Sequence, residues 1–327
     1  MEEKAEADSR VKNTSELPSL IFLGTPEFAV PSLRKLAAAG ADILLVVTQP
    51  DRFRGRGKKL TPSPIKAVAE SLGIAVYQPE RIRAEPAIQQ IAAHRAQCLV
   101  VVAYGQLLPQ GLLEKPSCGT INVHASLLPR YRGAAPIQRA LLEGEKITGI
   151  SIMLLDAGMD TGPILQQQTF AVSDQETFGS LHDKLAASGA DLLLETLALW
   201  KAGDVAAIAQ EEHLATYAPP IRKSELQLSW HEAAEHLVDR IRAFDPWPGA
   251  HCHYQGKRLK CFAATLLPWK GSGQGGEILG VAQEGLVVHA GDQRMIAIGA
   301  LQLEGHRRLS AGDFVRGHPM ARGSHLE

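Results

Sequence analysis

LIFLGTPEFAVPSLRKLAAAG, residues 20–40, is the stretch that decides the fold of this 327-residue chain. The short apolar run Leu20–Leu23 predicts a buried strand, and Gly24-Thr25-Pro26 predicts the turn that follows it. Phe28–Ala39 then predicts a helix that ends at Gly40, because glycine readily adopts the left-handed backbone that closes a helix. The turn lacks the G-x-G-x-x-G pattern, which argues against a nicotinamide-dependent enzyme.

The same unit of apolar run, turn and helix recurs along the chain. Further strands are predicted at Ile43–Thr48, Ala75–Tyr77, Cys98–Ala103, Thr120–His124 and Gly149–Leu155, and further helices at Ile65–Leu72, Pro86–Arg95 and Thr177–Lys201. Alternating strands and helices of this length predict an α/β fold, a parallel sheet with helices on both faces. Such a sheet carries its chemistry at the carboxyl ends of its strands.

A second domain is predicted after the polar segment Gly203–Ile221, which is broken by Pro219-Pro220 and reads as a linker. His231–Phe244 has apolar residues at helical spacing. Five short runs then alternate apolar and polar residues between glycine turns: Ala250–Tyr254, Arg258–Ala264, Glu277–Val281, Leu286–Ala290 and Met295–Leu303. Five such strands favour a small OB-like β-barrel, a type used for nucleic-acid binding. We therefore expect a flexible tail over 1–19, an α/β domain over 20–203, a linker over 204–221 and a β-barrel domain over 222–327.

The composition is typical of a soluble globular protein, with 45% apolar and 21% charged residues. Its 34 Lys and Arg against 35 Asp and Glu leave a net charge of −1, so a nucleic-acid partner would have to be held by a local patch. Neither a long apolar run nor a signal-peptide core is present, so we expect a cytoplasmic protein with no membrane contact. Four cysteines without C-x-x-C spacing predict reduced thiols.

Polar side chains occur at the end of the predicted strand Thr120–His124. Asn122 and His124 lie two residues apart, so their side chains share one face of the strand while Ile121 and Val123 pack the other way. An amide and a titratable imidazole would therefore converge at the edge where such a sheet carries its chemistry. From the strand alone, a catalytic pair and a hydrogen-bonded structural pair both remain open.

The loop Asp156–Gly162 places two carboxylates and two glycines after another predicted strand. An ordinary turn and a cation site are both open, although a third carboxylate nearby in sequence is missing and a metal is weakly supported. A carboxylate that orients His124 is the sharper hypothesis, because an aspartate partner fixes the tautomer of an imidazole. His251-Cys252-His253 does not predict a metal site, because alternation on a strand sends the cysteine to the opposite face.

A run of positive charge lies between Asp51 and Leu60: Arg52, Arg54, Arg56, Lys58 and Lys59. Interruptions at Pro50, Gly55 and Gly57 argue against a helix and predict a mobile arm. Charge runs are usually solvated loops, so from composition alone a solvated loop and a nucleic-acid contact are both open.

Taken together, several segments resemble the methionyl-tRNA formyltransferase family. These are Gly24–Phe28, Thr48–Arg52, Gly55–Lys59, Asn122–His124, Ser126–Gln138, Asp156–Gly162, Arg242–Phe244 and Pro246–Pro248. The resemblance implies a Rossmann-like formyltransferase domain followed by a barrel that helps to hold tRNA. It also implies formyl transfer from 10-formyltetrahydrofolate to the α-amine of methionyl-initiator tRNA, without a metal, by a cytoplasmic enzyme that we expect to be a monomer.

The resemblance also implies roles for particular residues. It places catalysis at Asn122, His124 and Asp160, tetrahydrofolate binding at Ser126, Leu127, Leu128 and Pro129, and tRNA binding at Arg52, Arg54, Arg56, Lys58 and Lys59. Two departures stand out. Tyr131 stands where many members have tryptophan, and Phe53-Arg54 replaces the more usual proline and small residue.

The sequence leaves three other functions to consider. A related formyltransferase with a small amine substrate, or a formyltetrahydrofolate hydrolase, would use the same asparagine, histidine and aspartate. The basic loop and the second domain argue against the enzymes with small substrates. A tRNA-binding module without catalysis is disfavoured because the three polar residues are all present.

Overall fold

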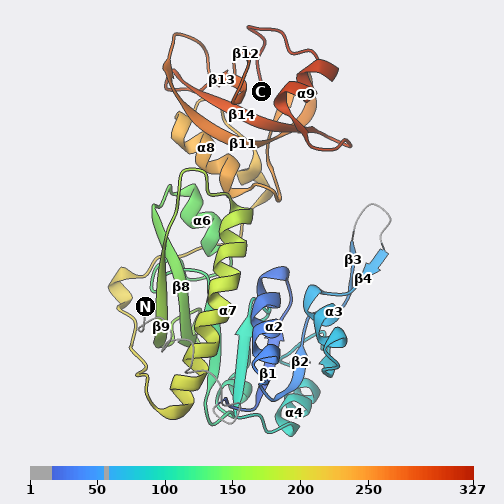
Figure 1. Cartoon of the computed structure of the whole chain (residues 1–327), viewed down its shortest axis with the longest axis vertical. Helices are drawn as coiled ribbons and strands as arrows, with labels where there is room; N and C mark the ends of the chain where they lie inside the picture. Colours follow the sequence, from blue (N-terminus) through green and yellow to red (C-terminus); the bar gives the residue numbers. More distant parts are fainter. Residues whose placement is uncertain (1–16, 55–58) are drawn as a thin grey trace, which may run out of the picture. The chain divides into compact units, whose positions relative to one another are not determined.

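The computed structural model describes residues 17–54 and 59–327 (Figure 1). By its internal contacts the chain divides into two compact units. The first comprises Met1–Arg132, Gly149–Thr169 and Lys184–Thr216, and the second comprises Gly133–Thr148, Phe170–Asp183 and Tyr217–Glu327. These units group segments by their contacts and are not continuous along the chain, so they do not test the predicted domain limits. The limits at 203/204 and 221/222 therefore stay predictions.

Within the described residues, seven strands form the sheet of the α/β part, in the order β5-β2-β1-β6-β7-β8-β9. They are β1 (Leu20–Gly24), β2 (Ile43–Val47), β5 (Val76–Tyr77), β6 (Cys98–Val102), β7 (Thr120–His124), β8 (Ile147–Leu154) and β9 (Ile164–Ala171). The pairs β1–β2, β1–β6, β2–β5 and β6–β7 are parallel, which confirms the predicted sheet. Strand β8 runs antiparallel to β7, which the repeated strand–helix pattern did not predict.

Helices connect these strands: η2 (Glu27–Ala29), α2 (Val30–Ala38), α3 (Pro64–Ser71), α4 (Glu85–Ala93), α5 (Gln110–Leu113) and α7 (Phe178–Ala202). Helix α3 begins where its sequence dictates, since Ser63 Oγ accepts the backbone N–H of Lys66 at 3.1 Å and Pro64 occupies the first turn. Glycines in the left-handed conformation follow α2 and α3, at Gly40 and Gly73. The predicted helices are thus present, and the short α5 is an addition.

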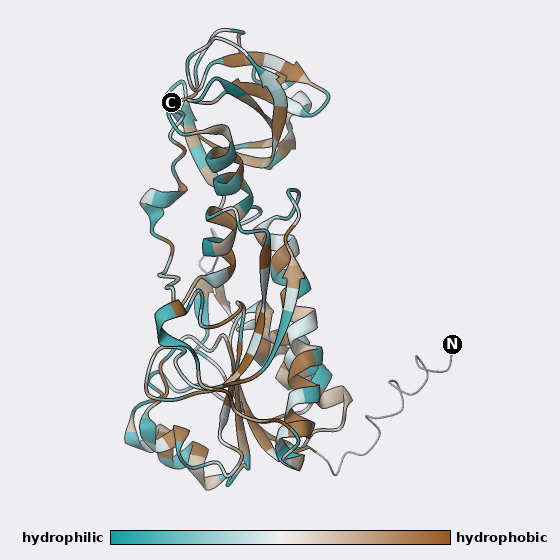
Figure 2. Cartoon of the chain, turned by 90° about the vertical axis from the view of Figure 1, so that its left-hand side faces the viewer, coloured by the Kyte–Doolittle hydropathy of each residue, from teal (hydrophilic) through white to brown (hydrophobic). Residues whose placement is uncertain are grey.

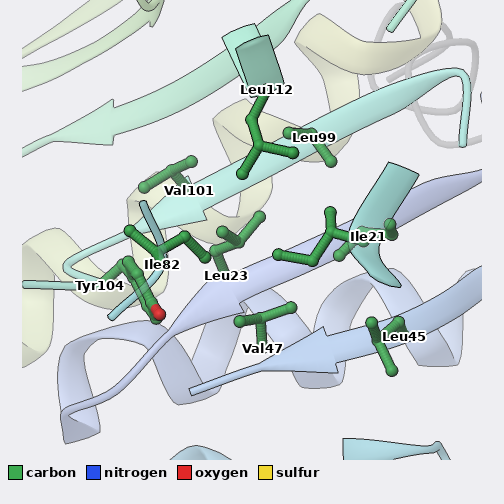
Figure 3. Packing of buried hydrophobic residues seen from close by; sticks show 10 residues of the cluster. Ile21, Leu23, Leu45, Val47, Ile82, Leu99, Val101, Tyr104 and Leu112 are labelled. Atoms are coloured by element: carbon green, nitrogen blue, oxygen red, sulfur yellow. The ribbon is translucent and has the colours of Figure 1, made fainter. Parts of the chain in front are cut away.

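The core beside the central strands comes from alternate residues of those strands. Figure 3 shows the side chains of one such cluster, with a pair from each of three neighbouring strands: Ile21 and Leu23, Leu45 and Val47, Leu99 and Val101. Ile82, Tyr104 and Leu112 complete it from the connecting segments. Truncating a leucine of this kind to alanine costs about 2–5 kcal/mol, so the cluster holds β1, β2 and β6 in place within the sheet.

The two described ends of the basic segment are strands, and they pair with each other. Strand β3 (Arg52–Arg54) lies antiparallel to β4 (Lys59–Thr61), a pairing that the charge pattern did not predict. The backbone of Arg54 and Lys59 belongs to this ladder. Arg56 and Lys58 lie outside the described residues.

The second unit contains an antiparallel sheet in the order β10-β11-β14-β13-β12. Its strands are β10 (Ala250–Tyr254), β11 (Lys257–Lys270), β12 (Ile278–Ala282), β13 (Gly285–His289) and β14 (Arg294–Leu303), with β15 (Leu309–Ser310) pairing to β14. All five predicted strands are confirmed. Helices α6 (Pro136–Leu142) and α8 (Ala234–Ala243) pack together in this unit, and α9 (Ala311–Gly317) follows β15. Figure 2 shows hydrophobic residues interspersed with hydrophilic ones along this sheet.

The His251-Cys252-His253 run behaves as alternation predicts. Cys252 is fully buried with its Sγ 3.8 Å from Cys261 Sγ, whereas both histidines are partly exposed. All four cysteines are free thiols. In the part of the chain that the structure describes, no helix is both long and apolar enough to cross a membrane.

Candidate active site

Strand β7 brings Asn122 and His124 to the carboxyl edge of the sheet. Asn122 stands opposite Met153 of β8, and His124 stands opposite Ser151. Val123 points to the other face, toward α7. Its Cγ1 packs so close to Gly189 of that helix that a Cβ added to the glycine would lie only 3.1 Å away. Asn122 and His124 are only 9% and 6% exposed, so the two polar side chains share one largely buried face, as alternation predicted.

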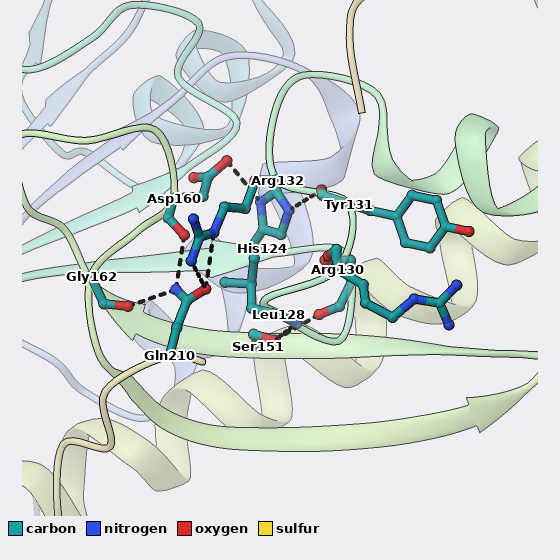
Figure 4. Close-up of polar contacts among 10 residues, drawn as sticks. His124, Leu128, Arg130, Tyr131, Arg132, Ser151, Asp160, Gly162 and Gln210 are labelled. Carbon is teal, nitrogen blue, oxygen red and sulfur yellow. Dashed lines mark hydrogen bonds and ion pairs between the residues drawn. The ribbon is translucent and has the colours of Figure 1, made fainter. Parts of the chain in front are cut away.

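The ring of His124 is oriented by contacts at both nitrogens (Figure 4). Its Nε2 lies 2.9 Å from the backbone carbonyl of Tyr131, and because a carbonyl only accepts, Nε2 donates. A neutral ring then has its proton on Nε2 and a free lone pair on Nδ1. The Oδ2 of Asp160 lies 3.7 Å from Nδ1. A proton that the ring gains must therefore go to Nδ1, where a carboxylate faces it.

Asp160 reaches this position from the loop after β8. Its own backbone is left-handed, with φ of 54°. Asp156, the other carboxylate of the loop, accepts hydrogen bonds from Gly158 N at 3.0 Å and from Thr161 Oγ1 at 2.6 Å. The structure therefore brings Asp160 to His124 and uses Asp156 to shape the loop. Across the described ranges, no group of three His, Cys, Asp or Glu side chains is arranged to hold a metal ion.

The carboxamide of Asn122 has a different environment. Within the described residues it has no side-chain hydrogen bond, although the residue is largely buried. A buried amide without a protein partner leaves its donors and its acceptor available to a ligand. Asn122 therefore supplies a free hydrogen-bonding group on the same face as His124.

The segment Ser126–Pro129 follows β7, and its polar groups are largely bound to the protein itself. Ser126 Oγ donates to a backbone carbonyl four residues further on, at 2.6 Å. Ser151 Oγ donates to the carbonyl of Ser126 at 2.7 Å and accepts from Leu128 N at 3.0 Å. Gln167 Nε2 donates to the carbonyl of Leu128 at 2.9 Å. The segment is thus a fixed wall whose apolar side chains, rather than its hydroxyl, remain for a ligand.

Sequence reasoning missed the residues that hold this site together. Arg132 is 0% exposed, and its guanidinium binds both carboxylate oxygens of Glu212, at 2.8 and 2.9 Å, and the amide oxygen of Gln210, at 3.1 and 2.9 Å. The hydrogen bond from Arg132 holds the pKa of Glu212 below its ordinary value. Arg132 lies in the quoted motif, but Gln210 lies in the predicted linker, where no local pattern marks it.

A cavity of about 460 Å³ lies at the carboxyl ends of β1, β2 and β6. Among its lining residues are Thr25, Gln49, Arg52, Thr61 and Gln106. Among the predicted basic residues, Arg52 is the one whose side chain the structure describes. It is exposed and lines this cavity, beside the β3–β4 hairpin. The cavity therefore offers neutral polar groups, the guanidinium of Arg52 and the carboxylate of Glu80 at the edge where α/β sheets bind ligands.

Comparison with known proteins agrees with this fold. Residues 19–197 match the family model described as formyl transferase, and residues 220–319 match that of the formyl transferase C-terminal domain. The fold and the polar site at its sheet edge therefore define a formyl transferase.

The relatives narrow this class. Methionyl-tRNA formyltransferase of Pelotomaculum thermopropionicum is 45% identical over 93% of this chain and 97% of its own length. The enzyme of the same name from Chromobacterium violaceum is 46% identical over 94% of this chain and 99% of its own length. The chain belongs to the methionyl-tRNA formyltransferase family.

Solved structures share the fold at lower identity. HypX from Aquifex aeolicus in complex with tetrahydrofolic acid superimposes with a TM-score of 0.63 at 16% identity, covering 95% of this chain and 50% of that one. The N-formyltransferase from Helicobacter canadensis gives a TM-score of 0.64 at 18% identity, covering 86% of this chain and 98% of that one. At these identities the likeness concerns the fold alone.

Proposed function

We propose that this protein transfers a formyl group from 10-formyltetrahydrofolate to the α-amine of methionyl-initiator tRNA, for translation initiation. The observation that carries the proposal is the membership of nearly the whole chain in a family whose relatives have this name. The convergence of Asn122, His124 and Asp160 at one strand edge supports it, because these are the groups that such a transfer needs.

The reaction starts when the neutral α-amine attacks the formyl carbon. An α-amine has a reference pKa of about 8, so a substantial fraction is already neutral near neutral pH. The attack gives a tetrahedral intermediate in which negative charge develops on the formyl oxygen and positive charge on the nitrogen. The carbon–nitrogen bond to the folate then breaks, and the folate nitrogen leaves with a proton. The protein must therefore stabilise an oxyanion and move one proton.

Asn122 and His124 meet the first requirement. The Asn122 amide has no protein partner among the described residues, so its N–H can be donated to the developing oxyanion. Once the His124 ring has taken the proton of the amine, the imidazolium adds positive charge on the same face of β7. Removing one such donor typically lowers the rate by about 10²–10³-fold.

His124 and Asp160 together meet the second requirement. Because Nε2 is committed to the Tyr131 carbonyl, the proton of the attacking amine is received at Nδ1, directly or through water. The Asp160 carboxylate, 3.7 Å from Nδ1, stabilises the charged ring until the proton passes to the folate nitrogen. This route uses only groups of the chain and needs no metal.

The donor and the tRNA are assigned to different surfaces. We assign tetrahydrofolate to the wall formed by Ser126, Leu127, Leu128 and Pro129, whose bound backbone supports a fixed shape. The acceptor end of the tRNA is assigned to the predicted basic loop with Arg52, Arg54, Arg56, Lys58 and Lys59, because Arg52 lines the 460 Å³ cavity, and the remaining tRNA contacts are assigned to the C-terminal domain. We also propose that the enzyme acts as a monomer, because Asn122, His124 and Asp160 all belong to one chain, and that it works in the cytoplasm, where tRNA is charged.

The deciding experiment supplies 10-formyltetrahydrofolate with either methionyl-initiator tRNA or glycinamide ribonucleotide, and measures the formylated product and free formate. Formyl-methionyl-tRNA is the expected product. Formylation of the small amine alone would replace this proposal with the small-substrate enzyme, and formate release without an acceptor would indicate the hydrolase. Binding of tRNA with no product would indicate a binding module.

A second measurement tests the basic loop. Arg56→Ala should impair the use of tRNA and leave folate binding nearly intact. Each lost phosphate contact should also lower the slope of log K against log salt by about one unit. An unchanged slope together with an unchanged rate would make this loop an ordinary solvated surface.

A further inference from the structure

The side chain of Gln210 bridges two parts of the candidate active site (Figure 4). Its Nε2 donates to the carbonyl of Asp160 at 2.8 Å and to the carbonyl of Gly162 at 2.7 Å. Its Oε1 accepts from Nε and from a terminal nitrogen of Arg132, at 3.1 and 2.9 Å. Both donors and the oxygen of this carboxamide are therefore used inside the protein.

Only one orientation of the carboxamide satisfies these partners. The two carbonyls only accept, so they require the NH₂ group, and the guanidinium only donates, so it requires the oxygen. Arg132 is itself fixed, because it is fully buried and forms two hydrogen bonds to the carboxylate of Glu212. The direction in which Gln210 donates is therefore set by a buried guanidinium, and reversing it would lose both hydrogen bonds from Arg132 and turn an NH₂ group toward a positive charge.

The loop that Gln210 holds needs such support. Asp160 has a left-handed backbone, which costs a residue with a side chain about 1 kcal/mol or more. Gln210 binds the carbonyl of Asp160 itself and the carbonyl two residues further on, so it spans the strained peptide units. The direction of the Asp160 side chain follows from this backbone conformation, and with it the 3.7 Å separation from His124 Nδ1.

The same connecting segment also fixes the histidine side of the site. Thr216 Oγ1 accepts the N–H of Tyr131 at 2.9 Å, and Thr216 O accepts the N–H of Arg132 at 2.9 Å. The carbonyl of Tyr131 is the group that binds His124 Nε2. Residues 210–216 thus hold Asp160 through Gln210 and His124 through the backbone at Tyr131.

We propose that Gln210 is a positioning residue for the reaction, which acts by holding the Asp160–Gly162 turn so that the Asp160 carboxylate faces His124. This inference rests on the proposed function, since its readout is formyl transfer. Gln210 touches neither substrate nor a reacting atom in this role. Its effect passes entirely through the placement of Asp160.

The test compares Gln210→Ala and Gln210→Glu in the full-length protein. Glutamate keeps the size of the side chain and an oxygen for Arg132, but it presents an oxygen without a proton to two carbonyls. Both variants should lower kcat by about 10²-fold, the loss typical of a misplacement of about 1 Å, with little change in KM for 10-formyltetrahydrofolate. Gln89→Glu on the exposed face of α4 is the matched control and should keep the wild-type kcat.

A double-mutant cycle separates positioning from a general structural role. If Gln210 acts through Asp160, then Gln210→Ala should cost little further kcat in an Asp160→Asn background. Equal losses in both backgrounds would overturn the inference, and so would wild-type kcat in both Gln210 variants. Should Gln210→Ala fail to fold, Gln210→Glu carries the same cycle, because it retains the partner of Arg132. Absence of formyl transfer by the wild-type protein would instead contradict the proposed function.

Discussion

Gly162→Ala provides a sharp test of how the Asp160 loop is placed. A Cβ at this position would lie 2.0 Å from the backbone carbonyl oxygen of Leu154 and 3.3 Å from the backbone nitrogen of Asp156. Real Cβ atoms essentially never come within 3.0 Å of such an atom, so the loop must retreat by at least 1.0 Å from β8. Backbone of a sheet strand cannot yield as the end of a flexible side chain can, so the loop is the part that moves.

The magnitude follows from that displacement. The Asp160 carboxylate already lies 3.7 Å from His124 Nδ1, so a retreat of this size alters the separation by a large fraction. It also disturbs the 2.7 Å hydrogen bond from Gln210 to the carbonyl of Gly162. A misplacement of about 1 Å costs about 10²-fold in rate, and we expect that loss in kcat. Overpacking of this kind should lower the free energy of unfolding by about 1–3 kcal/mol.

The assay is single-turnover formyl transfer at saturating 10-formyltetrahydrofolate, which separates chemistry from binding, together with a thermal melt of each variant. Gly111→Ala in α5 is the matched control, because an added Cβ there meets nothing within 4 Å. It should keep the wild-type rate, and it should be neutral or slightly stabilising because alanine favours a helix. A folded Gly162→Ala variant that is as active as Gly111→Ala would refute the argument that the loop geometry sets the rate.

Three further predictions concern the site and the packing around it. His124→Ala and Asp160→Asn should each lower kcat by about 10²–10⁴-fold in the same single-turnover assay, and the double variant should lose far less than the product. Asn122→Asp should be at least as damaging as Asn122→Ala, because it places negative charge where negative charge develops. The pKa of Glu212 is lowered in the folded protein, so its ion pair stabilises the fold above its ordinary pKa of about 4.3, and this stabilisation is lost on acidification. The melting temperature of the wild type should therefore exceed that of Glu212→Gln at neutral pH, and the difference should shrink below about pH 4.

The features that the sequence predicts well are those fixed by neighbours along the chain. Apolar runs such as Leu20–Leu23 predict buried strands because a strand covered on both faces needs apolar residues throughout. The two-residue spacing of Asn122 and His124 fixes their common face for the same local reason. Strand β9 was missed because its central residues, Gln166 to Thr169, are polar and partly exposed, so they show neither alternation nor an apolar run.

The geometry of the candidate site depends instead on contacts between distant segments. The identity of Asp160 as a candidate came from its loop and from the family motif, but its position at His124 is held by Gln210, 50 residues away. Likewise Tyr131, whose carbonyl binds His124, donates its backbone N–H to Thr216, 85 residues away. No periodicity or turn signal in 203–216 predicts these hydrogen bonds, so the sequence of this segment is that of a linker.

The segment after α7 therefore supports the candidate site as well as connecting two parts of the chain. In a linker that only joins two domains, we would not expect a carboxamide whose donors and oxygen are all hydrogen-bonded, to two loop carbonyls and to a buried guanidinium. Here Arg132 is fully buried and would be destabilising without Gln210 and Glu212, so the segment must lie where it does for the fold to tolerate that charge. Once it lies there, the same bonds fix the backbone around Asp160. Stability of the buried charge and placement of the Asp160 carboxylate are therefore one structural requirement.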